Sequence, residues 1–386
     1  MTEGSKSVEE WLVGLPGSFD GHVKHKCENG SSSRNSETSS YVGDSFYPFP
    51  SRTSKWNIAC LESLGIFYNK NYHDSPQNIL SMIFEETGAF GPVLEEQTCN
   101  ATDVKQSVTF NFPISEMVDM LTDKDKVTLN NGESFFPEIE HDIDKCTSVK
   151  IREFLFNCQL MLSCRAAFFY DWRENIEPKD MFVEILEKFA RLCQLITVPG
   201  SACSAKKTMM TLQNVSVTSK ADLVMIPERY RRRTFSAKDR ATCVVSVVEI
   251  NNLKQRKSKA EIKKDAKHLK SSVEDGEKDS TEPPQIYTKV NTDILAQHGG
   301  DLLIHRQLYC STLSSSTVYL YLPGMIVAGT EVIFTLMQIH RKHLMQLKEQ
   351  KDTDLRATIY YSKPKDLFKK EDRDELVEAF TRLSNI

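Results

Sequence analysis

The chain has 386 residues, of which 40% are hydrophobic and 26% are charged, and its formal net charge is −4 at pH 7. This composition is typical of a globular protein and excludes a collagen-like, low-complexity or wholly disordered chain. The small net charge identifies no partner, because charges that nearly cancel over a whole chain can still be concentrated in one segment.

The first residues show no basic segment followed by an apolar one, so we expect an intracellular protein, in the nucleus or the cytoplasm, with reduced cysteines. The most membrane-like segment, 318–339, is interrupted by Pro323, Gly324 and Gly329. Because these residues favour turns, we expect a strand over 318–322, a turn, and a second strand or helix over 331–339. No contact with a membrane is predicted.

The pattern before residue 179 divides into two parts. Residues 1–52 contain a long run of Ser, Asn and Gly with few apolar side chains, which predicts a disordered tail. Residues 53–178 predict a mostly helical region that ends in a long amphipathic helix over 149–170. Within this region, the short alternating segment Thr109–Phe112 is typical of a strand.

Residues 179–345 predict an α/β, or α+β, core in which helices and strands alternate. An amphipathic helix is expected over 179–196, before the breakers Pro199 and Gly200. The following elements are predicted in chain order: two strands within 208–226 forming a hairpin around Gln213-Asn214, a strand over 243–250, a helix over 290–309 and a strand over 318–322. A charged insertion is predicted over 251–285, and a C-terminal extension over 346–386 contains a helix from about Lys370 to Leu383.

Two acids accompany apolar, β-branched runs in this core. Asp222 stands in the segment Lys220–Ile226, and Glu249 follows directly after the run Cys243–Val248. Two carboxylates held by neighbouring strands can bind a divalent cation such as Mg²⁺ or Mn²⁺. Such a cation can activate water against a phosphodiester, so the pattern indicates metal-dependent hydrolysis.

The order helix, three strands, helix, strand over 179–339 resembles the αβββαβ core of the PD-(D/E)xK, or restriction-endonuclease-like, nuclease superfamily. In that superfamily an Asp at a strand end and an Asp/Glu-x-Lys motif on the next strand bind Mg²⁺, and the lysine orients the attacking water. The resemblance implies that Asp222 and Glu249 bind the cation, with the backbone carbonyl of Ile250 as a further ligand. The chain departs from the motif at Asn251, which stands where the lysine is expected.

Three residues are candidates for the missing lysine's role. Asn251 can position a water through its amide without supplying positive charge. Lys220 precedes Asp222 by two residues, so on a strand the two side chains would share a face. Lys254 is the third candidate. The resemblance also implies a polar residue from the later helix, for which Gln297 is available to contact phosphate or water.

A basic segment surrounds the two candidate acids. Residues 229–270 contain fourteen Lys or Arg against four Asp or Glu. On a nuclease these side chains would contact backbone phosphates. The candidate nucleic-acid-binding residues are Arg231, Arg232, Arg233, Lys254, Arg256 and Lys257. Aromatic residues that could stack on unpaired bases are sparse here, which favours duplex DNA over RNA or single strands; a solvated linker or a nuclear import signal would explain the same charges.

The sequence therefore predicts a divalent-metal-dependent nuclease that hydrolyses phosphodiester bonds of nucleic acid. The alternative is a catalytically degenerate protein that keeps the nuclease fold and acts as a nucleic-acid-binding or protein-interaction scaffold. A third interpretation assigns Asp222 to an ordinary turn and Glu249 to an edge-strand salt bridge.

Overall fold

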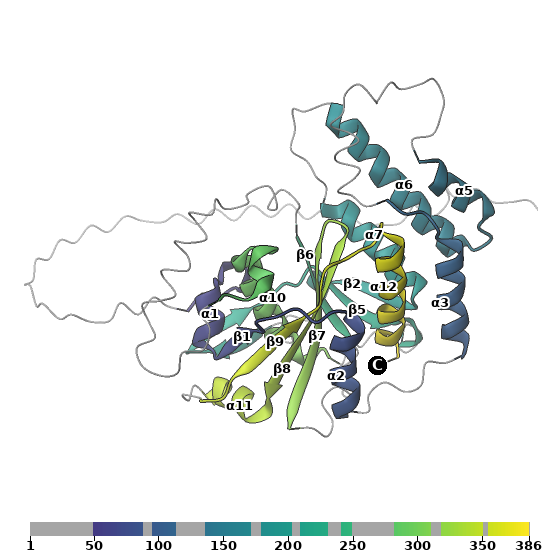
Figure 1. Cartoon of the computed structure of the whole chain (residues 1–386). Helices are drawn as coiled ribbons and strands as arrows, with labels where there is room; N and C mark the ends of the chain where they lie inside the picture. The colour runs from purple at the N-terminus through teal and green to yellow at the C-terminus, as the bar shows by residue number, and fades with distance from the viewer. Residues whose placement is uncertain are drawn as a thin grey trace, which may run out of the picture. The chain divides into compact units, whose positions relative to one another are not determined.

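The computed structural model of the chain describes residues 49–87, 95–112, 136–170, 179–202, 209–230, 241–248, 282–309, 318–349 and 354–385, without the side chains of 86, 87, 95, 163–170, 179 and 248. Elements carry the labels of Figure 1. Nearly all of the expected tail and nearly all of the expected charged insertion lie outside these ranges. Within them, no helix combines the length and the apolar character needed to cross a bilayer.

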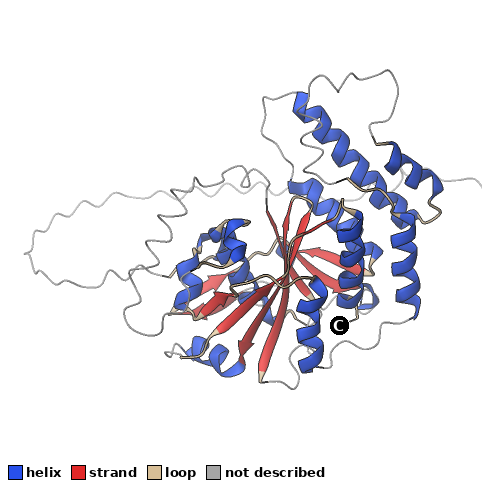
Figure 2. Cartoon of the chain, in the orientation of Figure 1, coloured by secondary structure: helices blue, strands red, loops and turns tan. Residues whose placement is uncertain are grey.

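A mixed sheet forms the centre of the described part of the chain (Figure 2). Its strands pair in the order β1-β9-β8-β7-β6-β5-β2, and β10 pairs separately with β8. Their bounds are β1 Ile66–Tyr68, β2 Leu195–Pro199, β5 Leu223–Pro227, β6 Cys243–Val248, β7 Tyr319–Ala328, β8 Glu331–His340, β9 Ala357–Tyr361 and β10 Lys365–Asp366. The chain is thus a mixed α/β protein, as the sequence predicts.

Helices cover both faces of this sheet (Figure 1). Their bounds are α1 Ile58–Ser63, α2 Pro76–Thr87, α3 Glu95–Ser107, α5 Pro137–Lys145, α6 Val149–Tyr170, α7 Lys179–Leu192, α10 Thr292–Ile304, α11 Arg341–Glu349 and α12 Lys370–Leu383. The predictions for α6 and α12 are confirmed at both ends, and the predicted helix over 290–309 is α10 followed by the short 3-10 helix η8, His305–Gln307.

Neighbouring side chains on β8 show which helices lie on which face. The ring of Phe334 packs on Phe380 of α12 with centroids 5.7 Å apart. The hydroxyl of Thr335, the next residue, lies 2.8 Å from Nε2 of His298 on α10. Because successive side chains of a strand point to opposite faces, α12 and α10 lie on opposite sides of the sheet. Phe189 of α7 also packs on Phe380, which places α7 in the layer of α12.

Strand β6 and strand β7 are parallel neighbours joined through α10. Val244 pairs with Gly324, and the register continues to Val248 opposite Ala328. On its other side β6 is antiparallel to β5, with Leu223 opposite Val245. The crossover places α10 against β6 and β7, and β6 is also the neighbour of β5, beside which the candidate site lies.

The first strand of this core was predicted as the end of a helix, and this boundary was wrong. The helix α7 ends at Leu192, and the backbone of Gln194 has φ of 60°. A non-glycine residue in this left-handed region ends a right-handed helix. The β-branched run Ile196-Thr197-Val198 then pairs with β5 inside strand β2. Its β propensity prevails over the helical spacing that extended the prediction to 196.

The hairpin predicted around Gln213-Asn214 is confirmed, but it does not belong to the central sheet. Strands β3, Met209–Leu212, and β4, Val215–Thr218, form a separate two-stranded sheet. Gln213 and Asn214 both have positive φ, at 46° and 63°, as a tight two-residue hairpin turn requires. The second core strand is β5, which follows the hairpin.

The turn predicted between residues 322 and 331 is present but starts later than expected, because Pro323 and Gly324 lie inside β7. Pro323 and Gly324 pair with β8 in an unbroken register, and the turn comes at Gly329, whose φ is +65°. Gly324 is required by packing. An added Cβ would lie 2.6 Å from the Thr335 hydroxyl and 2.9 Å from Nε2 of His298. The segment after this turn is the strand β8, one of the two forms expected.

The segment Thr109–Phe112 is not a strand, because side chains satisfy much of its backbone. The N–H groups of Thr109 and Phe110 donate to Oδ2 of Asp142 at 2.6 and 2.9 Å. From the other side, the buried Arg373 donates to the carbonyls of Val108 and Phe110. These partners replace the neighbouring strand that the alternating pattern predicts.

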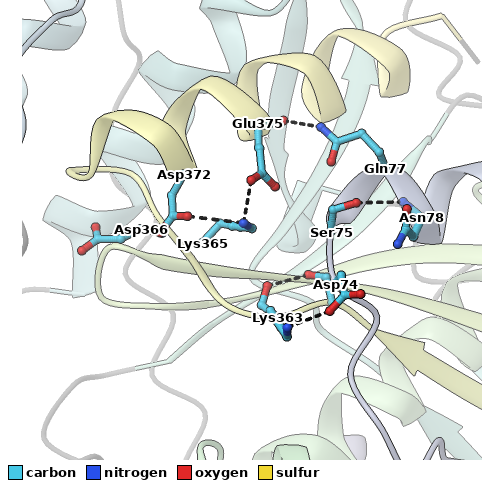
Figure 3. A network of polar contacts seen from close by, with 10 residues as sticks. Asp74, Ser75, Gln77, Asn78, Lys363, Lys365, Asp366, Asp372 and Glu375 are labelled. Carbon is cyan, nitrogen blue, oxygen red and sulfur yellow. Dashed lines mark hydrogen bonds and ion pairs between the residues drawn. The ribbon is translucent and has the colours of Figure 1, made fainter.

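A polar network joins the start of α12 to β10 and to the segment before α2 (Figure 3). Nζ of Lys365 lies 3.4 Å from Asp372 and 2.8 Å from Glu375, and Lys363 pairs with Asp74 at 2.7 Å. These groups lie near the protein surface, so the network aligns elements rather than forming part of the apolar core.

Candidate functional site

The candidate site lies where β5 begins beside the end of β6. Asp222 directly precedes β5 and is half-buried. Its Oδ2 accepts a hydrogen bond from the backbone N–H of Val247 at 2.8 Å. Val247 is the penultimate residue of β6, so the Asp222 carboxylate lies beside the end of this strand.

The backbone of the segment before β5 is held closely against the end of β2. The N–H of Gly200 donates to the carbonyl of Asp222 at 3.1 Å. A Cβ added at Gly200 would lie 1.9 Å from the carbonyl oxygen of Ala221. Only glycine allows this approach, so Gly200 contributes to the position of the chain at Ala221 and Asp222.

A stripe of polar residues on α10 and η8 faces this segment. Gln297, Asp301 and His305 are spaced by four residues, which places them on one face of a helix. Oδ1 of the fully buried Asp301 accepts hydrogen bonds from the hydroxyls of Ser219, at 2.6 Å, and Thr53, at 2.7 Å. Thr53 belongs to the 3-10 helix η2, Thr53–Lys55. Asp301 therefore joins three segments that are far apart in the sequence.

The imidazole of His305 completes this cluster. Its Nδ1 lies 2.9 Å from the carbonyl oxygen of Asp301 and 3.0 Å from the hydroxyl of Ser219. A carbonyl oxygen only accepts hydrogen bonds, so we assign the ring proton to Nδ1. Burial lowers the pKa of His305, and the imidazole is therefore neutral at physiological pH.

Electrostatics connect the buried acid with Asp222. The pKa of Asp301 is raised to about 6, mainly by burial, and the negative charge of Asp222 contributes to this rise. Hydrogen bonds from Ser219, Thr53 and Gln297 oppose this rise by stabilising the ionised form. Asp222, Asp301 and Gln297 therefore interact within one polar region.

A second histidine fixes α10 against the sheet. Nδ1 of His298 lies 2.8 Å from the hydroxyl of Ser246 on β6, and Nε2 lies 2.8 Å from the hydroxyl of Thr335 on β8. Burial lowers the pKa of His298 to about 3, so this ring is neutral and joins two hydroxyls. His298 is a structural connector between the strands and the helix that carries Gln297 and Asp301.

The described part of the chain thus brings two of the predicted site residues, Asp222 and Gln297, into one region. Lys220 is exposed and lies before β5 begins at Leu223, so the strand alternation used to place it on the face of Asp222 does not apply. The remaining predicted residues lie outside the described ranges: Glu249, Ile250, Asn251, Arg231, Arg232, Arg233, Lys254, Arg256 and Lys257.

Sequence reasoning did not identify Ser219, Asp301, His305 or Thr53. A signal for two of them exists in the sequence, because Asp301 and His305 continue the four-residue spacing of Gln297 along a mostly apolar segment. Polar residues on one stripe of a buried helix need partners, so the stripe indicates a polar contact. Nothing in the local pattern identifies Ser219 or Thr53 as those partners.

Apart from the ring nitrogens of His305, the donor atoms gathered here are mainly oxygens, which suit Mg²⁺ or Mn²⁺ better than softer metals. Among the described residues, no group of three or more His, Cys, Asp or Glu side chains is placed to hold a metal ion. A cation at Asp222 would therefore need further ligands from other parts of the chain, and Glu249, the residue after Val248, is the acid nearest to the end of β6 in the sequence.

Comparison with known proteins gives no functional assignment for this chain. No protein-family model, no curated protein and no solved structure matches this chain.

Proposed function

We propose that this protein is a divalent-metal-dependent nuclease in which Asp222 and Glu249 bind the cation. One observation carries the proposal, namely the hydrogen bond from the Val247 N–H to Asp222. It fixes the carboxylate beside the end of β6, and Glu249 follows Val247 by two residues in the sequence. Two carboxylates brought to one end of adjacent strands are the minimum for holding Mg²⁺ or Mn²⁺ in such an enzyme.

The topology supports a PD-(D/E)xK-like core. In chain order, α7, β2, β5, β6, α10 and β7 give a helix, three strands that pair antiparallel in succession, a helix and a strand parallel to β6. This is the αβββαβ order of that superfamily, with the hairpin β3–β4 inserted between the first and second strands. In this proposal Asp222, which directly precedes β5, and Gln297 on α10 correspond to the acid and to the polar helix residue of that superfamily.

In the proposed mechanism, Asp222 and Glu249, with the carbonyl of Ile250, hold Mg²⁺ or Mn²⁺. When bound, the cation would polarise the scissile phosphate and activate water. Asn251 or Lys220 would orient the attacking water, and Gln297 would contact that water or a phosphate oxygen. The neutral His298 holds α10 against β6, which keeps Gln297 at a fixed distance from the strand end.

The proposed substrate is nucleic acid, with duplex DNA favoured over RNA. The basic residues Arg231, Arg232 and Arg233 follow η5, Glu228–Tyr230, and Lys254, Arg256 and Lys257 follow β6 in the sequence. Lys and Arg side chains that neutralise phosphates make binding strongly dependent on salt. We propose that the protein acts inside the cell, in the nucleus or the cytoplasm.

The experiment that tests the proposal compares the parent protein with Asp222→Asn and Glu249→Gln. Each protein is incubated with plasmid, single-stranded DNA and RNA in the presence of Mg²⁺, Mn²⁺ or EDTA. We expect metal-dependent cleavage by the parent and a loss of at least about a hundredfold in both variants. Asp103→Asn makes the same chemical change on the exposed surface of α3 and should retain the parent rate.

Equal cleavage by the parent and Asp222→Asn would contradict the proposal, because the activity would then come from a contaminant. The second candidate function, a degenerate scaffold, rests on Asn251 in place of the motif lysine. It predicts that the parent binds DNA without cutting it, and that charge-removing variants of Arg231, Arg232 and Arg233 weaken this binding. Gel-shift assays at two salt concentrations measure that outcome.

A further inference from the structure

The chain from Ser219 to Asp222 is fixed by side-chain and backbone contacts rather than by strand pairing. The Ser219 hydroxyl donates to Asp301, and the Asp222 carbonyl and carboxylate accept from the N–H groups of Gly200 and Val247. This segment lies before the first residue of β5, so the sheet register does not by itself fix Asp222. The Val247 N–H contacts its side chain directly, and the Gly200 N–H holds its backbone.

One of those contacts comes from a group that is unusual in a protein interior. Asp301 is fully buried, and its carboxyl accepts from two hydroxyls through the same oxygen, Oδ1. Burying an acid is unfavourable unless hydrogen bonds compensate for the lost hydration. An apolar side chain at this position would fill the space without fixing the direction of Ser219. The acid therefore supplies a directional contact that packing alone does not give.

We propose that Asp301 is a positioning residue that acts through Ser219 to hold the Asp222 carboxylate where a cation binds. The consequence for cation binding rests on the proposed function. The consequence for the position of Asp222 does not, because it follows from the hydrogen bonds alone. Asp301 is assigned no contact with the substrate or the cation.

The two hydroxyls on Oδ1 provide a matched pair of tests. Ser219 and Thr53 are both buried, and each donates one hydrogen bond to the same oxygen. Ser219 is three residues from Asp222, whereas Thr53 belongs to η2, close to the first described residue. Ser219→Ala and Thr53→Val each remove one hydroxyl and little volume. Ser219→Ala also removes the contact with His305, so it should lower the melting temperature at least as much as Thr53→Val does.

Amide hydrogen exchange of the full chain gives the first readout, and it needs no metal. The Gly200 and Val247 amides donate to Asp222, so their protection reports the position of that residue. We expect Ser219→Ala to accelerate exchange at both amides about tenfold, and Thr53→Val to leave both rates within about twofold of the parent. Ser219→Thr, which keeps a hydroxyl, should restore the parent rates.

Calorimetric titration with Mn²⁺ gives the second readout. We expect Ser219→Ala to weaken Mn²⁺ binding about tenfold, Asp222→Asn to abolish it, and Thr53→Val to leave it unchanged. Asp301→Leu should match or exceed the effect of Ser219→Ala. If Ser219→Ala and Thr53→Val accelerate exchange equally, or if neither does, the positioning role is wrong. If the parent fails to bind Mn²⁺ while the exchange difference persists, the proposed function is overturned and the positioning of Asp222 stands.

Discussion

Two buried ionisable side chains, Asp301 on α10 and Arg373 on α12, lie on opposite faces of the central sheet and have different kinds of partner. Arg373 donates to the carbonyls of Leu367, Val108 and Phe110, and its guanidinium stacks 4.1 Å from the centroid of the Phe110 ring. Asp301 accepts from two hydroxyl groups. Arg373 thus fixes backbone within the packed interior. By contrast, Ser219, one partner of Asp301, is three residues before the half-buried Asp222.

The two groups also differ in whether they change charge near neutral pH. Burial lowers the pKa of Arg373 to about 10, so its guanidinium stays charged at physiological pH. Burial raises the pKa of Asp301 to about 6, within the range where cells and assays operate. Arg373 shows that a buried charged group can contribute to folding alone. Asp301 is a buried group that titrates near neutral pH beside a half-buried acid, and this combination marks the region where function is expected.

The largest effect is expected on the Arg373 side. Arg373→Leu removes three hydrogen bonds and leaves buried carbonyls without a donor, so we expect a loss of about 3–5 kcal/mol in the free energy of unfolding. Urea unfolding followed by circular dichroism measures it. Arg382→Leu, the same substitution later on α12, should cost much less. A loss below about 1 kcal/mol for Arg373→Leu would show that this interior does not depend on the arginine.

The next largest effect is a pH dependence of stability that is expected from Asp301 and not from Arg373. The folded protein holds a proton on Asp301 more tightly than the unfolded chain does, because the pKa of Asp301 is raised from 3.8 to about 6. Stability from this group is therefore greatest below about pH 4 and falls as the pH rises through about 6. The difference in unfolding free energy between the parent and Asp301→Asn should fall by on the order of 2 to 3 kcal/mol over that interval. A difference that stays constant from pH 4 to pH 7 would contradict the assignment.

A third prediction concerns the close approach beside Asp222. In Gly200→Ala the added methyl group must displace the carbonyl of Ala221, so we expect a loss of about 1–3 kcal/mol in unfolding free energy. Thermal unfolding measures it, and Ser201→Ala, at the exposed neighbouring position, is the control. If Gly200→Ala is as stable as this control, the backbone at Ala221 is free to move and Asp222 is held less firmly than inferred.

The smallest effect is expected in the polar network of Figure 3. Lys365→Met removes the ion pairs to Asp372 and Glu375, and we expect a loss of about 0.5–1 kcal/mol that shrinks as salt is added. Lys363→Met, at the exposed pair with Asp74, should produce no measurable change. Chemical unfolding at 0.05 and 1 M NaCl, concentrations at which screening lengths are about 14 and 3 Å, tests this ranking. If the loss of unfolding free energy in Lys365→Met does not depend on salt, the stabilisation by Lys365 comes from packing rather than from charge.

Much of the fold could be predicted from residue patterns that are complete within one segment. The helices over 149–170 and 370–383 are long segments without an internal Pro or Gly, and the hairpin at Gln213-Asn214 carries its own turn residues. Errors arose where a partner elsewhere in the chain decided the structure. Leu195–Pro199 is a strand because β5 pairs with it, and Pro323-Gly324 stays extended because β6 and β8 hold it on both sides.

The same limit applies to the candidate site. Asp222 was identifiable because an acid beside an apolar strand segment is a local signal, and Gln297 followed from the resemblance. Thr53 and Asp301 are 248 positions apart in the sequence and meet only in the folded chain. A single sequence carries no indication of such a contact, because their partnership depends on packing α10 against the N-terminal segment.

The pairing of β1 with β9 has a consequence for how the protein forms during synthesis. Ile66, in the first described strand, lies opposite Ala357, near the end of the chain. A ribosome therefore releases β1 long before its hydrogen-bonding partner exists, and β8 also waits for β9 to cover its edge. A nascent or truncated chain that stops before residue 354 would expose an uncovered strand edge. We expect such a chain to aggregate or to require a chaperone, even though every residue of the candidate site has already been made.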